Sequence, residues 1–240
     1  TYFWSYQTDV FGLTTALSKP ADYAAGLNVG VWKFSRDDKG LLTATIQPPG
    51  GGGDQPIEEP LVTIYVYDDK TNLAGVSYHD GTGESWVYDP EFSVPTLHVD
   101  KLGQETEYEL DSSGNIETIT EIDGGPGPNR VTKFTYTQPP TAVSQLPGGL
   151  VLSTTVASGS AAAVTTKSDY LTSGATIGLV SKVYSAYDTA EETMVESTYD
   201  GYRNVDQFTN ERGIVTDYDY DALNRLTLTQ ARAMNRSNPS

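Results

Sequence analysis

The sequence predicts an all-β protein whose serial β-hairpins form one continuous, twisted and spiralling sheet. The first observation behind this prediction is an internal repeat, in which residues 100–116 overlay on residues 210–226 without a gap. The second is a shorter spacing, since Asp89 follows Asp68 by 21 positions and Asp111 follows Asp89 by 22. A period of about two dozen residues is typical of stacked supersecondary units.

Short runs in which apolar or aromatic residues alternate with polar ones predict the strands, because neighbouring side chains of a strand point to opposite faces. The clearest runs lie at residues 63–67, 105–110, 131–136 and 215–220. Residues 150–167 are rich in Val, Ser, Thr and Ala and are expected to form a plainer strand pair. Little helix is expected, since only residues 20–25 and 188–193 have room for a helical turn and neither carries an apolar stripe.

The connections carry a turn signature, Asp-x-x-Gly or a close variant, at residues 37–40, 111–114 and 221–224. Aspartate accepts backbone N–H bonds at the first position, and glycine or asparagine tolerates a left-handed backbone at the fourth. A second turn is expected before each aromatic strand, at Gly83, Gly103 and Gly213. One repeat therefore consists of strand, turn, strand, turn.

Some positions depart from this pattern. Thr71 replaces the turn glycine, Thr137 replaces the aspartate, and Asp200 is followed by Gly-Tyr-Arg-Asn, so altered turns are expected there. Gly- and Pro-rich stretches are expected to be long hairpin loops, with domain linkers as the alternative, at residues 48–54, 123–128 and 138–149. Residues 1–33 are expected to be an N-terminal strand segment, and residues 34–138 a repeat array with loop insertions. Divergent strand pairs follow at residues 139–186, further repeats at residues 187–230 and a tail at residues 231–240.

Composition excludes several functional classes. A formal net charge of -17 and a pI near 4.3 oppose binding to nucleic acid or to an anionic membrane. The chain has no cysteine, so disulfides and thiolate metal sites are excluded, and it has no apolar run long enough to insert into a membrane. No cofactor is expected. The richness in Tyr, Thr, Asp and Gly favours a secreted or cell-surface protein, and the uncharged start at residues 1–6 is expected to be a strand excised from a longer chain.

Few residues point to chemistry. Asp217, Asp219 and Asp221 alternate along one predicted strand and are weak calcium candidates, because they span roughly 13 Å, too far for one ion without loop oxygens. His79 and His98 are the two histidines, and each is expected to be a hydrogen-bonded surface residue. The 32 acidic residues supply many carboxylate pairs, but none stands in a setting that marks a glycosidase.

Aromatic residues offer the leading ligand hypothesis. Trp4, Trp32 and Trp86 are candidate platforms for stacking on neutral sugars, and packing in the core is the alternative for all three. Phosphate chemistry is not expected, because the glycine pair at residues 26–30 lacks the lysine of a phosphate-binding loop.

The recurring tyrosine–aspartate units resemble the YD repeats of RHS proteins over about residues 34–230. The units are carried by Tyr67, Asp68, Tyr88, Asp89, Tyr108, Asp111, Gly114, Tyr199, Asp200, Tyr218, Tyr220, Asp221 and Asn224. The resemblance implies a sheet of consecutive hairpins that spirals, and that in the best understood members closes into a hollow shell around a toxic C-terminal segment. Related arrays occur in bacterial secreted and surface proteins, insecticidal toxin complexes and teneurins. The chain lacks the Asp-Pro-x-Gly pair of the self-cleaving shell end, and its roughly ten units are too few to close a shell.

These observations predict a non-catalytic structural or interaction segment of a large secreted or surface protein. The partners expected are further copies or further repeats, which pair with the uncharged strand edges at residues 1–6 and 226–230 and give a fibre or a tube. The alternatives are a carbohydrate-binding module, part of a toxin-encapsulating shell, or an enzyme hidden in residues 139–186.

Overall fold

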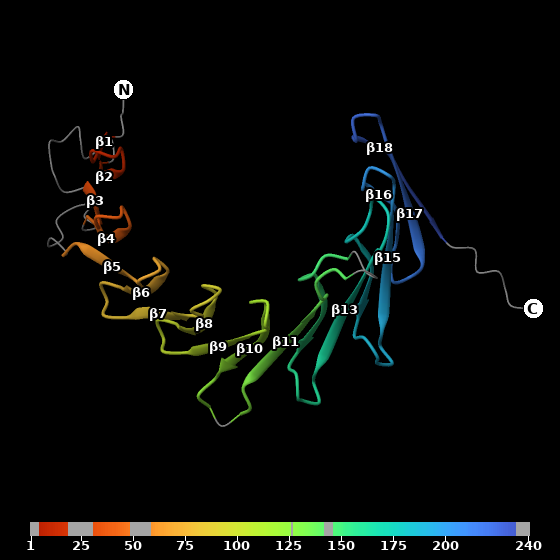
Figure 1. Ribbon diagram of the computed structural model, residues 1–240, viewed down its shortest axis with the longest axis horizontal. Helices are drawn as coiled ribbons and strands as arrows, with labels where there is room; N and C mark the ends of the chain where they lie inside the picture. Colours follow the sequence, from red (N-terminus) through yellow and green to blue (C-terminus); the bar gives the residue numbers. More distant parts are fainter. Residues whose placement is uncertain (1–4, 19–30, 49–58, 126, 142–145, 234–240) are drawn as a thin grey trace, which may run out of the picture. The chain divides into compact units, whose positions relative to one another are not determined.

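The computed structural model describes residues 5–18, 31–48, 59–125, 127–141 and 146–233, and these form strands and turns without a helix (Figure 1). The chain divides into two compact units, one up to Glu107 and one from Tyr108, so that the boundary falls inside β9. Up to that boundary the strands are β1 (Ser5–Thr8), β2 (Thr14–Ser18), β3 (Val31–Arg36), β4 (Leu42–Gln47), β5 (Leu61–Tyr67), β6 (Leu73–Ser77), β7 (Gly83–Tyr88), β8 (Pro95–Val99) and β9 (Glu105–Leu110).

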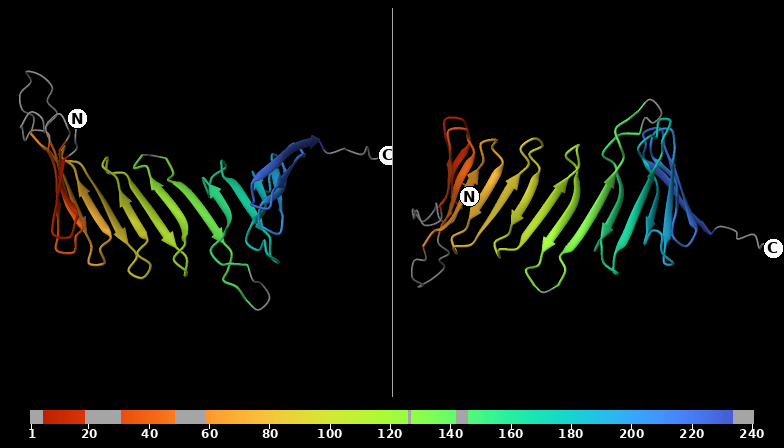
Figure 2. Two further views of the ribbon diagram at one scale, coloured as in Figure 1. Left: turned by 90° about the horizontal axis from the view of Figure 1, so that it is seen from above. Right: turned by 60° about the horizontal axis from the view of Figure 1, so that its bottom comes forward.

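The second unit continues in the same manner. Its strands are β10 (Ile116–Ile122), β11 (Arg130–Tyr136), β12 (Val151–Val156), β13 (Val164–Tyr170), β14 (Val180–Ser185), β15 (Thr193–Tyr199), β16 (Val205–Thr209), β17 (Ile214–Tyr220) and β18 (Leu226–Ala233). In each unit successive strands pair antiparallel along the chain, and the succession can be followed for the yellow and green strands in Figure 2. The predicted all-β fold of serial hairpins in one hydrogen-bonded sheet is confirmed. No described segment is a helix long and apolar enough to cross a membrane.

Nine of the described hairpin turns share one hydrogen-bond frame, whereas the turn at Asp89 has a longer one, from its N–H to the carbonyl of Val94. At Asp111, its N–H donates to the carbonyl of Asn115 at 2.8 Å, and the N–H of Gly114 donates back to the carbonyl of Asp111 at 3.0 Å. This is a type I turn followed by a left-handed residue, a three-residue hairpin loop that suits twisted strands. The same two bonds close the turns that begin at Asp9, Asp37, Asp68, Tyr78, Asp100, Asp200, Asn210 and Asp221.

The altered turns expected at Thr71 and after Asp200 are not found, and that prediction was wrong. Thr71 and Arg203 occupy the left-handed position themselves, with φ of 70° and 73°, and the turns keep the common frame. The backbone bonds and the aspartate oxygens outweigh the strain of a non-glycine residue in this conformation.

The turn at Thr137 encloses an insertion but closes in the same way. The N–H of Thr137 donates to the carbonyl of Leu150 at 2.9 Å, and the N–H of Gly149 donates to the carbonyl of Thr137 at 3.0 Å. The Thr137 hydroxyl accepts the N–H of Leu150 at 3.0 Å, which is the role of aspartate oxygens elsewhere. The stretch at residues 138–149 is therefore a hairpin loop, as predicted, and so is the stretch at residues 123–128, which joins the paired strands β10 and β11.

Gly83 is not a turn residue, which corrects the sequence-based prediction. The left-handed position of that turn belongs to Gly81, with φ of 83°, and Gly83 is the first residue of β7. A Cβ on Gly83 would lie 2.8 Å from the carbonyl oxygen of Val76 on the neighbouring strand. Glycine is required there by the close approach of two backbones. Gly103 and Gly213 do hold the predicted turn positions, with φ of 79° and 73°. The possible helical turn at residues 20–25 lies outside the described residues, as does the predicted loop at residues 48–54 except for residue 48.

A bulge follows each tyrosine-ended strand. In the β7–β8 pair, Val87 lies opposite Leu97 but Tyr88 lies opposite Pro95, which leaves Thr96 without a cross-strand partner. The Thr96 hydroxyl donates to the carbonyl of Val87. Ser181 and Thr227 make the equivalent bond at their bulges. A hydroxyl residue at the second position of the following strand thus satisfies a carbonyl that the bulge removes from the ladder.

The described part of the sheet has little buried core. Val76 and Val215 are the buried apolar side chains, at 7% and 9% exposure, and Thr118 and Thr137 are the buried polar ones. Most other side chains on both faces are half-buried or exposed. The fold therefore depends on cross-strand contacts and on hydrogen bonds at the turns more than on a thick apolar interior.

Candidate functional site: repeat locks and a polar cluster

Tyrosine hydroxyls lock one strand to the next at regular intervals. In each case the tyrosine is the last residue of its strand and its hydroxyl donates to the carbonyl of the first residue of the preceding strand. The bonds are Tyr67 to Leu42 at 3.0 Å, Tyr88 to Leu73 at 2.9 Å, Tyr136 to Ile116 at 2.6 Å, Tyr170 to Val151 at 2.7 Å and Tyr199 to Val180 at 2.7 Å. Burial raises the pKa of Tyr88, Tyr136 and Tyr170, which keeps their hydroxyls protonated as donors.

The sequence marked Tyr67, Tyr88 and Tyr199 as members of the repeat, but it did not reveal this role. It predicted the strand that ends at Tyr136 and the departure at Thr137 but did not include Tyr136 among the signature residues, and it missed Tyr170, where Leu171 replaces the aspartate. Alternation and spacing alone place both tyrosines correctly.

The aspartate that follows the strand clamps its own turn, after a tyrosine at Asp68 and Asp200 and after Leu110 at Asp111. Asp111 Oδ1 accepts the N–H groups of Ser113 and Asn115 at 2.8 and 3.0 Å, and Oδ2 accepts the Asn115 side-chain amide at 2.9 Å. Asn72 and Asn204 bind Asp68 and Asp200 in the same way. The asparagine bond lowers the pKa of Asp68, Asp111 and Asp200, so these groups are held as carboxylates. The signal in the sequence, an asparagine four residues after aspartate, was not recognised.

Further polar bonds join successive turns. Lys70 Nζ donates to the carbonyl of Pro90 in the next tyrosine–aspartate turn. Arg203 Nη1 donates to the carbonyl of Ala175 at 2.7 Å, which ties its turn to an earlier one. Asn204 donates to the side-chain oxygen of Asn224 at 3.2 Å. These bonds connect the turn of one repeat with a turn of a neighbouring repeat and so hold successive turns together.

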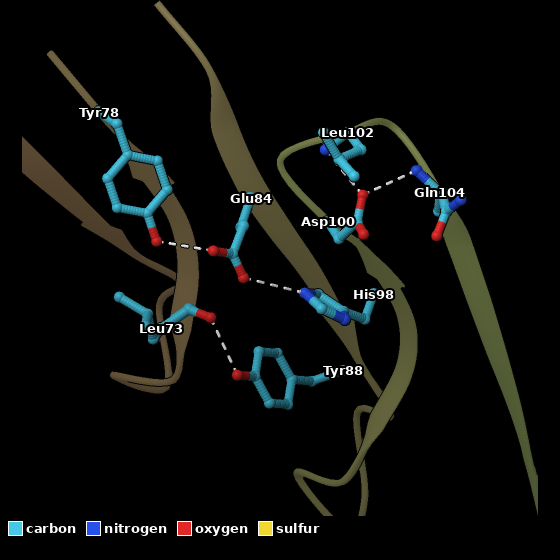
Figure 3. A network of polar contacts seen from close by, with 8 residues as sticks. All are labelled: Leu73, Tyr78, Glu84, Tyr88, His98, Asp100, Leu102 and Gln104. Carbon is cyan, nitrogen blue, oxygen red and sulfur yellow. Dashed lines mark hydrogen bonds and ion pairs between the residues drawn. The ribbon is translucent and has the colours of Figure 1, made fainter. Parts of the chain in front are cut away.

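A polar and aromatic cluster lies on β6–β8 of the first unit, around Glu84 (Figure 3). Tyr78 donates its hydroxyl to Glu84 Oε1 at 2.6 Å, and His98 Nε2 lies 3.3 Å from Glu84 Oε2. The sheet register explains the assembly, because Trp86 lies opposite His98 and Glu84 lies opposite Val76 on the same face. The Trp86 and His98 rings stack with centroids 4.9 Å apart and planes within 9°. We call the face that carries Tyr65, Trp86 and His98 the aromatic face of this unit.

The cluster holds an ionised carboxylate that is open to solvent. The hydrogen bond from Tyr78, followed by that from His98, lowers the pKa of Glu84, and the bond to Glu84 raises the pKa of Tyr78. The side chains of His98 and Glu84 keep 25% and 23% of their exposure. A carboxylate with a lowered pKa is a poor general acid but a good hydrogen-bond acceptor. The geometry suits binding of a polar molecule more than proton transfer.

The calcium candidates are not brought together as a metal site. Asp217 forms a two-point ion pair with Arg232, with both N–O distances 3.0 Å, and Asp221 pairs with Arg225 at 2.7 Å. Asp219 is exposed. Among the described residues no group of three or more His, Cys, Asp and Glu side chains is placed to hold a metal ion.

The other candidate residues are spread through the first unit. Trp32 is half-buried on β3 opposite Leu17, and His79 is exposed in the turn after Tyr78. Trp4 lies outside the described residues. Of the two described tryptophans, Trp86 is the one that belongs to a hydrogen-bonded cluster, because its ring stacks on His98, which contacts Glu84.

The divergent region contains one further charged cluster. Lys167 Nζ lies 4.8 Å from the ring centroid of Tyr187, 5.3 Å from that of Tyr184 and 3.2 Å from Asp169 Oδ1. The hydrogen bond to Asp169 raises the pKa of Lys167, which keeps the amine protonated. A protonated lysine is not a nucleophile, so this cluster gives no support to an enzyme at residues 139–186.

The fold has similar solved structures, but a scan of protein-family models and a search of the curated proteins found no match. The crystal structure of TcdB2-TccC3-Cdc42 matches with a TM-score of 0.60 and 14% identity, over 95% of this chain and 12% of that one. TcdB2-TccC3-TEV matches with a TM-score of 0.53 and 14% identity, over 98% and 14% of the two chains. The Photorhabdus luminescens Tc holotoxin pore matches with a TM-score of 0.52 and 12% identity, again over 98% and 14%. The chain spans about an eighth of the length of these structures, and the likeness establishes the hairpin fold they share with it.

Proposed function

We propose that this chain is a non-catalytic wall segment of a large RHS-type protein. The observation that carries the proposal is the fold, a series of hairpins. Nearly the whole length of this chain matches a part of the TcdB2-TccC3 structures. The tyrosine bonds and the aspartate clamps support it, because both recur along the series of hairpins and hold neighbouring strands and turns together. Such a segment contributes surface and stiffness to its parent.

The test is imaging of the parent protein, whose full sequence is obtained by sequencing outward from Thr1 and Ser240. We expect electron microscopy to show a hollow or tubular β-sheet body in which these hairpins form part of the wall. Turnover of a glycan or peptide panel by the purified segment, lost on changing a single Asp or Glu, would contradict the non-catalytic role. Fractionation of producing cells tests the secreted or surface location that the proposal implies.

Assembly through strand edges is part of the proposal. Among the described strands, β1 pairs with β2 and β18 pairs with β17, and residues 226–230 of β18 carry no charge. Unpaired N–H and C=O groups at such an edge favour pairing with another strand. We expect further repeats of the parent, or further copies of the chain, to extend the sheet there. Light scattering with negative-stain microscopy tests this, and a compact monomer at every concentration would contradict it.

A second candidate function is carbohydrate binding at the Glu84 cluster. The specific observation is that a tryptophan ring lies next to an ionised, solvent-accessible carboxylate on one face, since flat apolar rings and hydrogen-bond acceptors together suit neutral sugars. Neutral and anionic tetrasaccharides are titrated while the indole N–H signal of Trp86 is followed by NMR. We expect only neutral sugars to shift this signal, and we expect Glu84→Gln to weaken the effect. No shift with any sugar would leave Trp86 a packing residue.

A further inference from the structure

The face opposite the aromatic face of the first unit carries exposed apolar side chains. Ile64 and Val66 on β5 and Val87 on β7 are 48%, 54% and 54% exposed. Register places Leu97 opposite Val87 and Ile46 opposite Val62 on this same face. We call this surface the apolar strip, and it comprises Ile46, Val62, Ile64, Val66, Val87, Leu97 and Val99. Apolar side chains that are exposed in two groups on one face of a sheet are candidates for contact with a partner.

The middle of the apolar strip carries no side chain larger than serine. Gly75 lies opposite Val66 on one side and Ser85 on the other, and Ser77 lies opposite Ile64 and Gly83. Large apolar side chains therefore lie on β5 and on β7–β8. Between them only glycine and serine project from this face, so the backbone of the sheet is less covered there. Polypeptide that is laid on this face can approach the sheet closely there.

The fold does not require glycine at position 75. Its φ lies outside the left-handed region, and a Cβ there would meet the Glu84 carbonyl oxygen at 3.5 Å and the Val66 Cβ at 4.0 Å, which are ordinary contacts. Gly83 differs, because a Cβ at that position would lie 2.8 Å from a backbone oxygen. A glycine in a strand interior weakens the strand, and it often marks a place where another backbone comes near. Glycine at position 75 leaves room for the backbone of a partner to come near the sheet.

Acidic residues border one end of the apolar strip. Glu105 lies opposite Val99 and Glu107 lies opposite Leu97, so both share the face of the strip. Both are exposed, and neither takes part in the ion pairs found among the described residues. Two like charges on alternate residues of one strand favour a partner with basic groups at this end.

The dimensions favour a segment over a folded protein. From β4 to β8 the strip crosses four strand spacings, about 19 Å, and it runs for only about 10–13 Å along the strands. The resulting area of roughly 190–250 Å² is far below the roughly 800 Å² that each partner contributes to a standard interface between folded proteins. About six residues of extended chain are enough to cross it.

We propose that the apolar strip binds an extended segment of another polypeptide, which crosses β5 to β8 with small apolar side chains toward the sheet and places basic side chains beside Glu105 and Glu107. The close approach at Gly75, the exposed Val66 and Val87, and the unpaired glutamates each match one part of this ligand. The inference concerns one face of the first unit and does not depend on the role of the chain as a wall.

The experiment uses the 240-residue chain and a fluorescently labelled, end-capped peptide, Val-Ser-Val-Ser-Val-Ser-Lys-Ser-Lys, in anisotropy titrations to about 1 mM, which covers affinities typical of weak segment binding. A peptide with serine for every valine and a peptide with glutamate for both lysines are the matched probes. We expect saturable binding of the first peptide only. Binding that is equal for the serine peptide reports charge attraction alone and would overturn the proposal, as would no binding of any peptide.

Protein variants locate the site. The Val66→Thr, Val87→Thr double variant keeps two β-branched side chains and is expected to weaken binding about tenfold. Val164→Thr is the control, because Val164 is also 51% exposed but lies on β13. Glu105→Gln, Glu107→Gln is expected to remove most of the salt dependence. Unchanged affinity in the double valine variant would refute the site. Sedimentation of the chain alone is expected to show no dimer that the valine changes abolish, and such a dimer would show that a second copy covers the strip instead.

Discussion

Replacement of Tyr136 by phenylalanine isolates the contribution of one repeat lock. The change removes the hydroxyl that donates to the carbonyl of Ile116 at 2.6 Å and leaves the aromatic ring in place. A net intramolecular hydrogen bond contributes about 0.5–1.5 kcal/mol, and the half-buried Ile116 carbonyl regains only part of this from water. We therefore expect the free energy of unfolding to fall by about 1 kcal/mol, or roughly 2–4 °C in Tm for a chain of this size.

The assay combines urea unfolding with native-state hydrogen exchange, because repeat arrays do not always unfold in a single step. Exchange is expected to speed up first in β10 and β11, which the lock joins. Tyr202→Phe is the matched control, since Tyr202 is 78% exposed and lies in a turn of the same unit. If the two variants lose the same stability, or if protection in β10 and β11 is unchanged, the lock does not stabilise the repeat and the argument fails.

Other predictions concern the turns. Thr71→Gly is expected to raise the unfolding free energy by about 1 kcal/mol by relieving a left-handed threonine, as measured by urea titration. Gly83→Ala is expected to lower it by about 1–3 kcal/mol because of the backbone contact at 2.8 Å, whereas Gly75→Ala changes it little. Asp111 has a lowered folded pKa, so its stabilisation is present above the ordinary value of 3.8 and is lost as pH falls through the folded pKa; Asn115→Ala is expected to flatten this acid dependence in melts from pH 7 to pH 2.

Local sequence patterns predicted most of the fold for a physical reason. Strands such as residues 105–110 alternate strictly, and turns such as residues 111–114 need aspartate and a left-handed residue, so short stretches of sequence determine both. The same local reasoning failed at Thr71 and Arg203. There, bonds from aspartate, and for Arg203 a bond to the distant carbonyl of Ala175, hold a conformation that the residue type disfavours.

The candidate site was less predictable because it depends on register. Trp86 was marked as a platform, but its stacking on His98 follows from the pairing of β7 with β8, which single residues do not reveal. The pairing of Asp217 with Arg232 likewise follows from the long β17–β18 ladder and removes a carboxylate that had seemed free for calcium. Side chains that meet across strands are determined by bulges and turn lengths, which shift the register by single residues.

The closure of the Thr137 loop has a consequence for how such chains diversify. The insertion at residues 138–149 is sealed at its base by the same two backbone bonds that close a short turn, and β11 and β12 still pair normally beyond it. The loop between two strands can therefore vary in length and composition without changing how those strands pair. Evolution or design can therefore insert new peptide sequence at such turns while the neighbouring hairpins keep their register. The same sheet can then carry loops that differ in sequence and length.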